Sequence, residues 1–542
     1  MSASAGSTRN QYRLWCRILL FCFLEVTAVA AAQMQSGSTL PVPDSGTPVA
    51  ITGQVINAAS NMPIARALVR LNSRAILTTY NGKFEFDQVG NPTGFVQVSK
   101  PGFYASIEMG GFSGVFLQKS HITTPLVLRL YPEAIFAGTV TGPDGDPLAR
   151  VVVSARRSMF NSSGHTWIPV AQAQTDSHGR FRLPVPAGDY KLVSMYIPQI
   201  NGTDKAVLPV TLPAEDSSNT SGFFHIRSGE EQQYNLHPAM SRAYDVTATF
   251  DSAVERGFPR IIARSSTGGT ISLPVHFSRR DDQGAFKLEL PSGTYTLIAS
   301  VRSADGMVEG ETSVTVPDHD VSGVVFHLEP VPTLPVEMQA DGAATSDNPQ
   351  PSLMQFGLML ENSEADPDDF SFPLPLATQR GGVMSFTASP GSYRLRARND
   401  QGAWYIKSAS YGVSDLLQQQ FVVAPGAGGI PIRVTVSNQT GGLQGTCTLS
   451  GVQAVCWVYL IPTTPSASTV FTVRSNEQGV YNYAHLPPGS YQATAFEQMH
   501  SADYSDAAAL TPFATHVRSV TVSAGEKPTL DLDTVPEAEM AP

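Results

Sequence analysis

The chain contains few cysteines and few charged residues for its length. Only four of its 542 residues are cysteine, 15% are charged, and the net charge is −11. Proteins that bind nucleic acid or anionic lipid need clustered Lys and Arg to neutralise phosphate. The mature chain, which is the part after residue 32, also lacks an apolar run of roughly 20 residues, the length that spans a bilayer. The composition therefore argues against nucleic acid as a partner and against a transmembrane segment in the mature chain.

The sequence also lacks the motifs that mark common catalytic sites. None of the eleven histidines has a glutamate three residues later, and the HExxH zinc motif is also absent. G-x-S-x-G and S-x-x-K are absent, and Gly82-Lys83 is followed by Phe84 rather than by a phosphate-binding Ser or Thr. We predict a protein that is not an enzyme and has no metal and no cofactor. A hydrolase whose site is assembled from loops is the alternative, because such residues meet only in space.

Three stretches contain side chains that could bind a metal ion. Asp281-Asp282 lies in a repeated turn, which explains its carboxylates without an ion. The stretch 366–369 (Asp-Pro-Asp-Asp) lies in a proline-interrupted loop, with calcium as the alternative interpretation. His500 and Asp503 form the nearest approach to a metal motif, in a loop close to the C-terminus. We assign a metal to none of the three.

The first 32 residues have the pattern of a signal peptide. Arg9, Arg13 and Arg17 supply positive charge, the apolar run 18–24 follows, and three alanines end at Ala32. We predict cleavage after Ala32 and export to the periplasm, the cell surface or the medium, with an uncleaved anchor as the alternative. Removal of residues 1–32 takes away three Arg and one Glu, which changes the net charge from −11 to −13.

Glycine and proline are abundant in this chain. It has 45 Gly and 40 Pro, and 42% of its residues are hydrophobic. Gly and Pro interrupt helices, whereas the hydrophobic fraction is too high for disorder, so the composition favours short strands joined by tight turns. A chain of this length should divide into several domains.

A phrase of the form D-x-x-G-x-F followed by P-x-G-x-Y recurs along the chain. Its clearest copies begin at Asp176, Asp281 and Asn476, and weaker copies surround Gly82 and Gly382. The aligned glycines 82, 179, 284, 382 and 479 are 97, 105, 98 and 97 residues apart. Such regular spacing indicates five repeated units.

The repeated phrase has the physical features of a β-hairpin scaffold. An Asp or Asn side chain can accept hydrogen bonds from backbone N–H groups of the turn, and the Gly can adopt positive φ. The residues that follow alternate apolar and polar, the pattern of a strand with one buried face. We predict an all-β protein, a tandem array of about five transthyretin-like or immunoglobulin-like antiparallel β-sandwiches. The predicted parts are a signal peptide (1–32) and five sandwiches, at 45–131, 132–239, 240–331, 332–428 and 429–535.

The phrase is preceded by an F-x-G-x-V strand in three units. The copies read Ile51-Thr52-Gly53-Gln54-Val55, Phe136-Ala137-Gly138-Thr139-Val140 and Leu443-Gln444-Gly445-Thr446-Cys447. With this start, the unit resembles the carboxypeptidase regulatory-like domain, a transthyretin-like sandwich that is also grouped with carbohydrate-binding-like folds. The whole chain is similar to exported multi-domain proteins of acidobacteria. Units one and four depart from the pattern, since the first lacks a clear P-x-G-x-Y and the fourth lacks the F-x-G-x-V start.

Two cysteines remain after the signal peptide, which contains Cys16 and Cys22, is removed. In the alignment of the units, Cys447 takes the place of Val140, and Cys456 takes that of an apolar residue that opens the next strand. Both side chains should therefore point inward on adjacent antiparallel strands. We predict a Cys447–Cys456 disulfide, which an oxidising compartment favours. Two buried free thiols are the alternative.

Aromatic residues are the main candidates for ligand contacts. If Val458 and Leu460 face the core, then Trp457 and Tyr459 face outward and form a flat apolar platform. Trp404-Tyr405 and Trp167 lie in loop-like surroundings and are further candidates. We favour packing between neighbouring units for these rings, with stacking on sugar rings as the alternative.

These observations predict a structural or binding role outside the cytoplasm. The expected partners are a cell-surface or environmental glycan, or a protein of the cell envelope. Besides the hydrolase, a periplasmic docking module that serves an outer-membrane system is an alternative.

Overall fold

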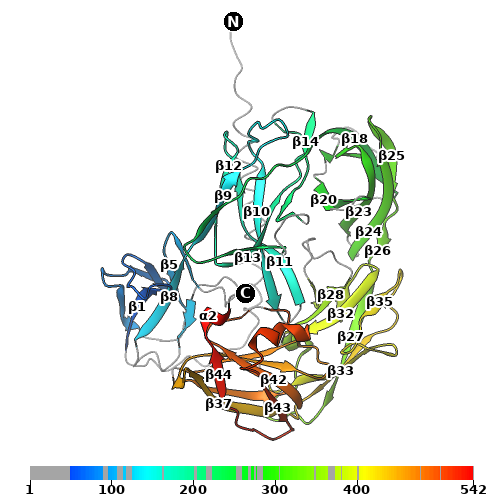
Figure 1. Ribbon diagram of the computed structural model, residues 1–542. Coiled ribbons are helices and arrows are strands. Elements are labelled where there is room, and N and C mark those ends of the chain that lie inside the picture. The colour runs from blue at the N-terminus through cyan, green and yellow to red at the C-terminus, as the bar shows by residue number, and fades with distance from the viewer. Residues whose placement is uncertain are drawn as a thin grey trace. The chain divides into compact units, whose positions relative to one another are not determined.

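The computed structural model of the chain is built almost entirely from β-strands (Figure 1). It describes residues 49–89, 95–105, 114–117, 125–161, 164–200, 204–214, 222–251, 259–266, 270–273, 276–277, 285–303, 306–346, 349–363, 373–379, 381–398, 402–476, 478–500 and 502–540. The predicted signal peptide, Asp281-Asp282 and residues 366–369 lie outside the described residues. No helix among the described residues is both long enough and apolar enough to cross a membrane.

The described residues form two compact units. One contains the described parts of Met1–Ile56, Met62–Ser99 and Gly114–Arg129, and the other contains those of Asn57–Asn61, Lys100–Ser113 and Leu130–Pro542.

Residues 49–132 contribute two four-stranded sheets, β4-β1-β8-β6 and β3-β2-β5-β7. The strands are β1 (Val49–Asn57), β2 (Leu68–Leu71), β3 (Arg74–Leu77), β4 (Lys83–Val89), β5 (Phe95–Ser99), β6 (Phe103–Ala105), β7 (Gly114–Phe116) and β8 (Leu126–Pro132). Alternating side chains of β1 and β4 are buried, Ile51 and Phe86 among them.

The second segment also forms two sheets, β12-β9-β17 and β11-β10-β13-β15, with β16 added to β13. Its strands are β9 (Ala134–Thr139), β10 (Val152–Asn161), β11 (Gly164–Gln174), β12 (Arg180–Val185), β13 (Gly188–Ser194), β15 (Thr211–Leu212), β16 (Phe224–Ile226) and β17 (Glu231–Gln233). The two sheets enclose a core that includes Phe136, Tyr190 and Leu192.

The third segment has the sheet β14-β18-β22-β21, with β25 beside β18, and the sheet β20-β19-β23-β24-β26. The strands are β14 (Lys205–Val207), β18 (Met240–Phe250), β19 (Arg260–Ser265), β20 (Thr270–Leu273), β21 (His276–Phe277), β22 (Phe286–Pro291), β23 (Gly293–Ser303), β24 (Gly306–Val316), β25 (Val321–Phe326) and β26 (Glu329–Pro330). Its core includes Phe286, Leu297 and Phe326.

The fourth segment has the sheets β30-β31-β27-β36-β33-β34 and β29-β28-β32-β35. The elements are β27 (Thr333–Asp341), the 3-10 helix η3 (Leu353–Phe356), β28 (Leu358–Asn362), β29 (Leu374–Pro375), β30 (Ala377–Thr378), β31 (Met384–Thr387), β32 (Gly391–Ala397), β33 (Tyr405–Tyr411), β34 (Ser414–Asp415), β35 (Phe421–Val423) and β36 (Ile432–Ser437). Its core includes Phe386, Leu395 and Val434.

In the fifth segment, β37 pairs with β38, β41 and β44, while β42 pairs with β39, β43 and β44, and β39 also pairs with β40. The elements are β37 (Gly441–Leu449), β38 (Val452–Gln453), β39 (Trp457–Pro462), β40 (Phe471–Arg474), β41 (Val480–Leu486), β42 (Gly489–Phe496), the 3-10 helix η4 (Ala507–Phe513), β43 (Arg518–Val522), β44 (Leu532–Val535) and the short helix α2 (Glu537–Met540).

The expected fold class, an array of β-sandwiches, is confirmed, with one difference in strand direction. In four segments the first strand pairs in parallel with a strand near the segment's end, and the pairs are β9–β17, β18–β25, β27–β36 and β37–β44. The second segment shows why. Its chain leaves the sheet of β13 and β16 and returns to the sheet of β9, where it runs alongside the first strand. We call this returning strand the closing strand.

The closing strands place two segment boundaries differently from the sequence prediction. Residues 432–437 were expected to open the fifth sandwich, but β36 pairs with β27 and β33, and Ile432 and Val434 lie in the fourth core. The glycine-rich stretch before it is thus a loop within the fourth segment. In addition, β14 was expected in the second sandwich, but it pairs with β18 of the third.

The repeated turn has the geometry that its sequence predicts. The Asp176 carboxylate accepts hydrogen bonds from the backbone N–H groups of His178 (2.8 Å) and Arg180 (2.9 Å), and Asn476 does the same for Gln478 and Val480. These backbone bonds, that of Arg180 foremost, hold the pKa of Asp176 below its usual value. Gly179 has φ of 71° and Gly479 of 72°, so both turns use the left-handed region that favours glycine.

The tyrosine of P-x-G-x-Y makes the same hydrogen bond in four segments. Its hydroxyl donates to the backbone carbonyl four residues earlier, and the pairs are Tyr190 to Pro186 (2.7 Å), Tyr295 to Pro291 (3.1 Å), Tyr393 to Ser389 (2.9 Å) and Tyr491 to Pro487 (2.5 Å). This arrangement matches the tyrosine corner of immunoglobulin-like sandwiches. It fixes the turn that opens the strand, and burial raises the pKa of Tyr190 and Tyr491 well above the usual value.

The glycine of the F-x-G-x-V strand lets the closing strand approach. A Cβ atom at Gly138 would lie 1.7 Å from the Tyr234 carbonyl oxygen, and one at Gly445 would lie 1.9 Å from that of Leu530. The aromatic ring of the repeated phrase covers the same glycine, because Gly138 pairs with Phe181 and Gly445 with Tyr481. No other residue type fits between the ring and the carbonyl.

The threonine after each of these two glycines makes a side-chain hydrogen bond to the closing stretch. The Thr139 hydroxyl donates to the side-chain oxygen of Asn235 (2.9 Å), and the Thr446 hydroxyl donates to the Asp531 carboxylate (2.7 Å). Asp531 also accepts from the Thr446 backbone N–H (2.9 Å), and these bonds lower its pKa. The repeated phrase does not include Asn235 or Asp531, although each directly follows the residue whose carbonyl faces the glycine, Tyr234 or Leu530.

We predict that Gly138→Ala destabilises the second segment. The added Cβ must displace the Tyr234 carbonyl or the Phe181 ring, which should lower the free energy of unfolding by about 2–3 kcal/mol. Pulse proteolysis in urea measures this change. Gly429→Ala is the matched control, because a Cβ there meets no atom within 4 Å. Equal stability of the two variants would contradict the close approach.

We also predict that Tyr190→Phe and Tyr491→Phe each lower the free energy of unfolding of their segment by about 1 kcal/mol, the usual contribution of one hydrogen bond. The ring and its packing stay, so the loss comes from the hydroxyl alone. Urea unfolding of the purified chain checks this expectation. Tyr80→Phe, at a tyrosine that is 89% exposed, should leave the midpoints unchanged.

Candidate functional site

The predicted disulfide between Cys447 and Cys456 is present. Both residues are fully buried in the core of the fifth segment. Its position differs from the expectation, because Cys447 lies on β37 and Cys456 directly precedes β39, and these two strands do not pair with each other. The disulfide therefore joins two non-adjacent strands across the core.

Trp457 and Tyr459 do not form an open platform. They lie on the face of β39 opposite Val458 and Leu460, as expected, but that face is covered. Tyr459 is only 2% exposed and packs on Phe496 and Tyr504, and Trp457 is half-buried against the same cluster. Alternation along β39 does not reveal this cover, because His500 and residues 502–513 fold back over the sheet as a second layer.

His500 belongs to this second layer rather than to a metal site. Its ring stacks on Phe496 with centroids 4.4 Å apart, and its Nδ1 lies 2.7 Å from the Tyr504 hydroxyl. Its backbone N–H donates to the Tyr459 hydroxyl (3.0 Å). Burial lowers the pKa of His500 to about 4. Nowhere in the described part of the chain do three or more His, Cys, Asp or Glu side chains gather as a metal site would require.

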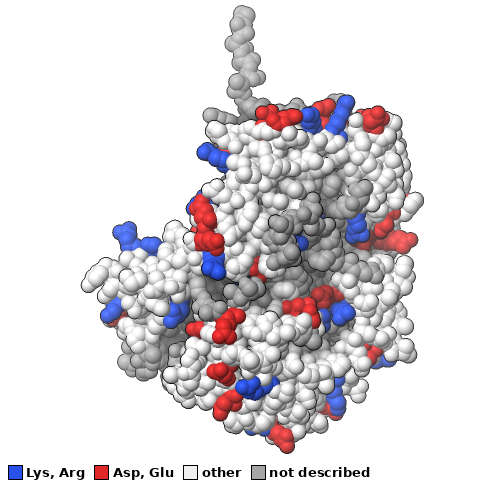
Figure 2. All heavy atoms as spheres, in the orientation of Figure 1, with Lys and Arg blue, Asp and Glu red and all other residues white. Residues whose placement is uncertain are grey.

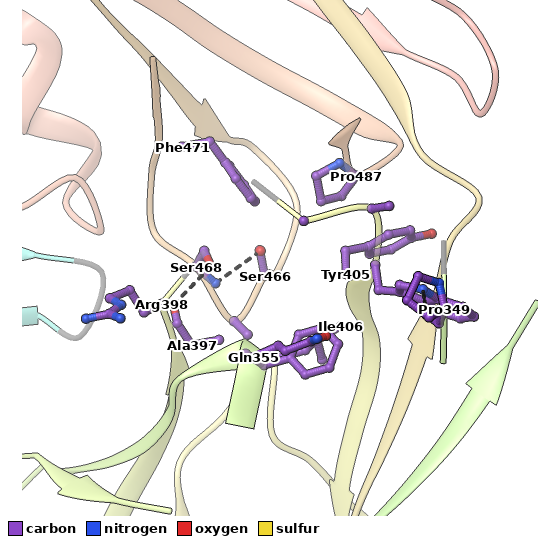
Figure 3. Close-up of a pocket in the computed structure, with 15 residues that line it drawn as sticks. Pro349, Gln355, Ala397, Arg398, Tyr405, Ile406, Ser466, Ser468, Phe471 and Pro487 are labelled. Carbon is purple, nitrogen blue, oxygen red and sulfur yellow. Dashed lines mark hydrogen bonds between the residues drawn. The ribbon is translucent and has the colours of Figure 1, made fainter. Parts of the chain in front are cut away.

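Trp404 and Tyr405 line a pocket of about 380 Å³. Residues of the fourth segment form part of its wall, and residues 466–468, Phe471 and Pro487 of the fifth segment form the rest. Figure 3 shows Phe471 and Pro487 on one side of the cavity and Gln355 and Ile406 on the opposite side. The structure thus brings two of the five predicted aromatic residues into one site, whereas Trp457 and Tyr459 lie in a separate cluster.

The walls of this pocket are tied to each other by hydrogen bonds. The Ala397 N–H donates to the Ala467 carbonyl (3.1 Å), and the Ser468 hydroxyl donates to the Ala397 carbonyl (3.1 Å). Trp404 is 7% exposed, and its Nε1–H donates to the Pro349 carbonyl (3.1 Å). Trp167, the remaining aromatic candidate, is 5% exposed, and the Lys191 ammonium lies 4.9 Å from its ring centre.

Comparison with known proteins finds only solved structures of low similarity. No family model and no curated protein matches the chain. Solved structures match with low scores. The Bacillus anthracis TIE protein is 14% identical over 52% of this chain and 51% of its own (TM-score 0.16), so the chain spans about half of that protein's length. The minor pilin of Streptococcus agalactiae is 15% identical over 35% and 95% (TM-score 0.20), and the major pilin subunit of Bacillus cereus is 11% identical over 74% and 99% (TM-score 0.12).

The strand pairing itself decides the class. The chain is a multi-domain β-sandwich repeat protein. Its likeness to the carboxypeptidase regulatory-like domain stays a prediction, since no family model matches. On the face shown in Figure 2, acidic and basic side chains are interspersed among wide uncharged areas, in keeping with a charged fraction of 15%.

We predict that the fifth segment loses stability as the pH falls from about 7 to 4. The unfolded chain binds a proton at His500 near pH 6.5, whereas the folded chain does so only near pH 4. Lowering the pH destabilises the fold wherever the unfolded state binds more protons than the folded state. Here the free energy of unfolding should fall by up to about 3 kcal/mol. Urea unfolding across this pH range should show a smaller slope for His500→Gln. The same substitution at the exposed His178 is the control, and an unchanged slope in His500→Gln would contradict the assignment.

Proposed function

We propose that the chain is an exported, non-catalytic structural or binding protein of the cell envelope, built from carboxypeptidase regulatory-like units. The Cys447–Cys456 disulfide is the observation that carries this proposal. Disulfides of this kind form and persist in oxidising compartments outside the cytoplasm. The apolar run and the alanines before residue 33 in the sequence support the same route.

The residues that recur along the chain support a structural role. The side chains of Asp176 and Asn476 accept hydrogen bonds from the backbone of their turns. The four corner tyrosines donate to the backbone carbonyl four residues earlier. Gly138 and Gly445 leave the space that the closing strands occupy. The residues that recur in the repeated phrase thus stabilise the β-sandwich architecture.

Contacts between successive segments support a continuous scaffold. Strand β14 from the stretch before residue 240 extends the sheet of β18, and the Tyr196 hydroxyl donates to the Glu289 carbonyl (2.8 Å). Ala467 of the fifth segment is buried in the core of the fourth. Such contacts restrict bending between the segments concerned, which suits a protein that holds a binding surface at a fixed place.

Carbohydrate binding is the second candidate function. The pocket beside Tyr405 favours it, because it places aromatic rings next to uncharged polar groups. It also moves the proposed contact away from Trp457 and Tyr459, whose face is covered.

Fractionation of cells that express the full chain tests the proposal. We expect the protein in the periplasm, the envelope or the medium, with residues 1–32 removed. Cys447 and Cys456 should be inaccessible to an alkylating reagent until a reductant and a denaturant are added. Ala30→Arg should block the shortening by placing a charge in the cleavage site. A cytoplasmic protein with two free thiols would refute the proposal, and turnover in a screen of glycan and peptide substrates would favour the hydrolase alternative.

A further inference from the structure

The pocket between the fourth and fifth segments has a preformed wall. Its two halves are held by the hydrogen bonds between Ala397 and the stretch Ala467–Ser468, and both Ala467 and Ser468 are buried. A site with fixed walls does not have to be ordered when a ligand enters, which favours binding. At about 380 Å³ it lies in the lower part of the range for small-molecule sites, which begins near 300 Å³.

The polar groups that face the pocket are uncharged. Neither a carboxylate nor a lysine is among the lining residues. The one charged residue of the lining, Arg398, directs its guanidinium group away from the cavity (Figure 3). Gln355 and Ser466 are the uncharged polar residues that remain beside Ser468, whose hydroxyl is bonded to Ala397.

Gln355 and Ser466 can both bond to a ligand. Gln355 is exposed on η3, and its amide offers two donor hydrogens and one acceptor oxygen. The Ser466 oxygen accepts a long bond from the Ser468 N–H (3.3 Å), which leaves its hydroxyl proton for a ligand. Such groups match the hydroxyls of a neutral ligand that both donates and accepts hydrogen bonds.

The aromatic wall supplies an apolar surface next to these groups. Phe356, Trp404 and Phe471 are each less than 10% exposed and act as fixed wall. Tyr405 is half-buried, so part of its ring remains accessible at the first residue of β33. A sugar ring has an apolar face of C–H groups and an edge of hydroxyls, and it therefore fits one aromatic face with polar groups beside it.

We propose that this pocket binds a single uncharged sugar ring, stacked on Tyr405 and hydrogen-bonded to Gln355 and Ser466. The inference rests on the proposed binding role and assigns it a place and a ligand class. Because the fourth and fifth segments both line the pocket, the site exists only when the two are joined. Binding of one ring is weak, with a dissociation constant on the order of 0.1–10 mM.

Calorimetric titration of the purified mature chain tests the proposal. The probes are D-glucose, D-galactose, D-mannose and N-acetyl-D-glucosamine, with D-glucuronic acid as the charged comparison. We expect saturable binding of at least one neutral sugar and weaker binding of the acid. Gln355→Ala and Ser466→Ala should each weaken binding about fivefold to tenfold, the effect of one lost hydrogen bond.

Matched variants separate a lost contact from a lost fold. Gln453→Ala changes an exposed glutamine on β38 that does not line the pocket, and it should bind as the unmodified chain does. All three variants should unfold at the same urea concentration, since Gln355 and Gln453 are exposed and Ser466 lies in a loop.

Three results would overturn the inference. They are the absence of binding by every neutral sugar, tighter binding of D-glucuronic acid, and binding that Gln355→Ala and Ser466→Ala leave unchanged. Fractionation tests the proposed function independently. An envelope protein that binds none of these sugars would therefore refute the sugar site alone, whereas a cytoplasmic one would refute the proposed function.

Discussion

The contact between a first-strand glycine and the carbonyl of a closing strand is the constraint on which the second and fifth sandwiches depend. At Gly138 and Gly445 the space for a side chain is occupied by the carbonyl oxygen of Tyr234 or Leu530. The ring of Phe181 or Tyr481 lies 3.1 Å from the same Cβ position. The closing strand can therefore add to the sheet, and its backbone groups are satisfied in the ladder, as for the Tyr234 N–H to the Ala137 carbonyl (2.9 Å). Gly53 repeats the arrangement with the Leu126 carbonyl.

Much of this architecture could be predicted from the sequence because local chemistry determines it. The Asp176 turn and the tyrosine corners involve residues only two to four positions apart, so a repeated phrase is enough to reveal them. The closing strands could not be found in this way. Strand β17 is only three residues long, and its place is set by contacts with a strand about 96 residues earlier, such as that between Asn235 and Thr139. The pairing of β36 with β27 could not be predicted for the same reason, because a glycine-rich loop resembles a linker until its strand partner is known.

The aromatic candidates show what alternation along a strand can and cannot predict. It correctly placed Tyr459 on the face of β39 away from the core that contains Val458 and Leu460. It could not show that Phe496, Tyr504 and Phe513 cover that face. Conversely, nothing local to Trp404 and Tyr405 indicated a pocket. The pocket depends on a loop of the fifth segment, and Ala467 reaches the core of the fourth. Sites made where segments meet are set by long-range packing, whereas turns are set by neighbouring residues.

Hydrogen exchange of the intact chain, resolved to single amides, tests the central claim that closing strands complete the sandwiches. The account predicts that the Tyr234, Leu236 and Leu530 amides, which donate to Ala137, Thr139 and Gln444, exchange as slowly as the first-strand amides of Val140 and Cys447. Exchange of the first three at the rate of exposed loops, with Val140 and Cys447 still protected, would contradict it.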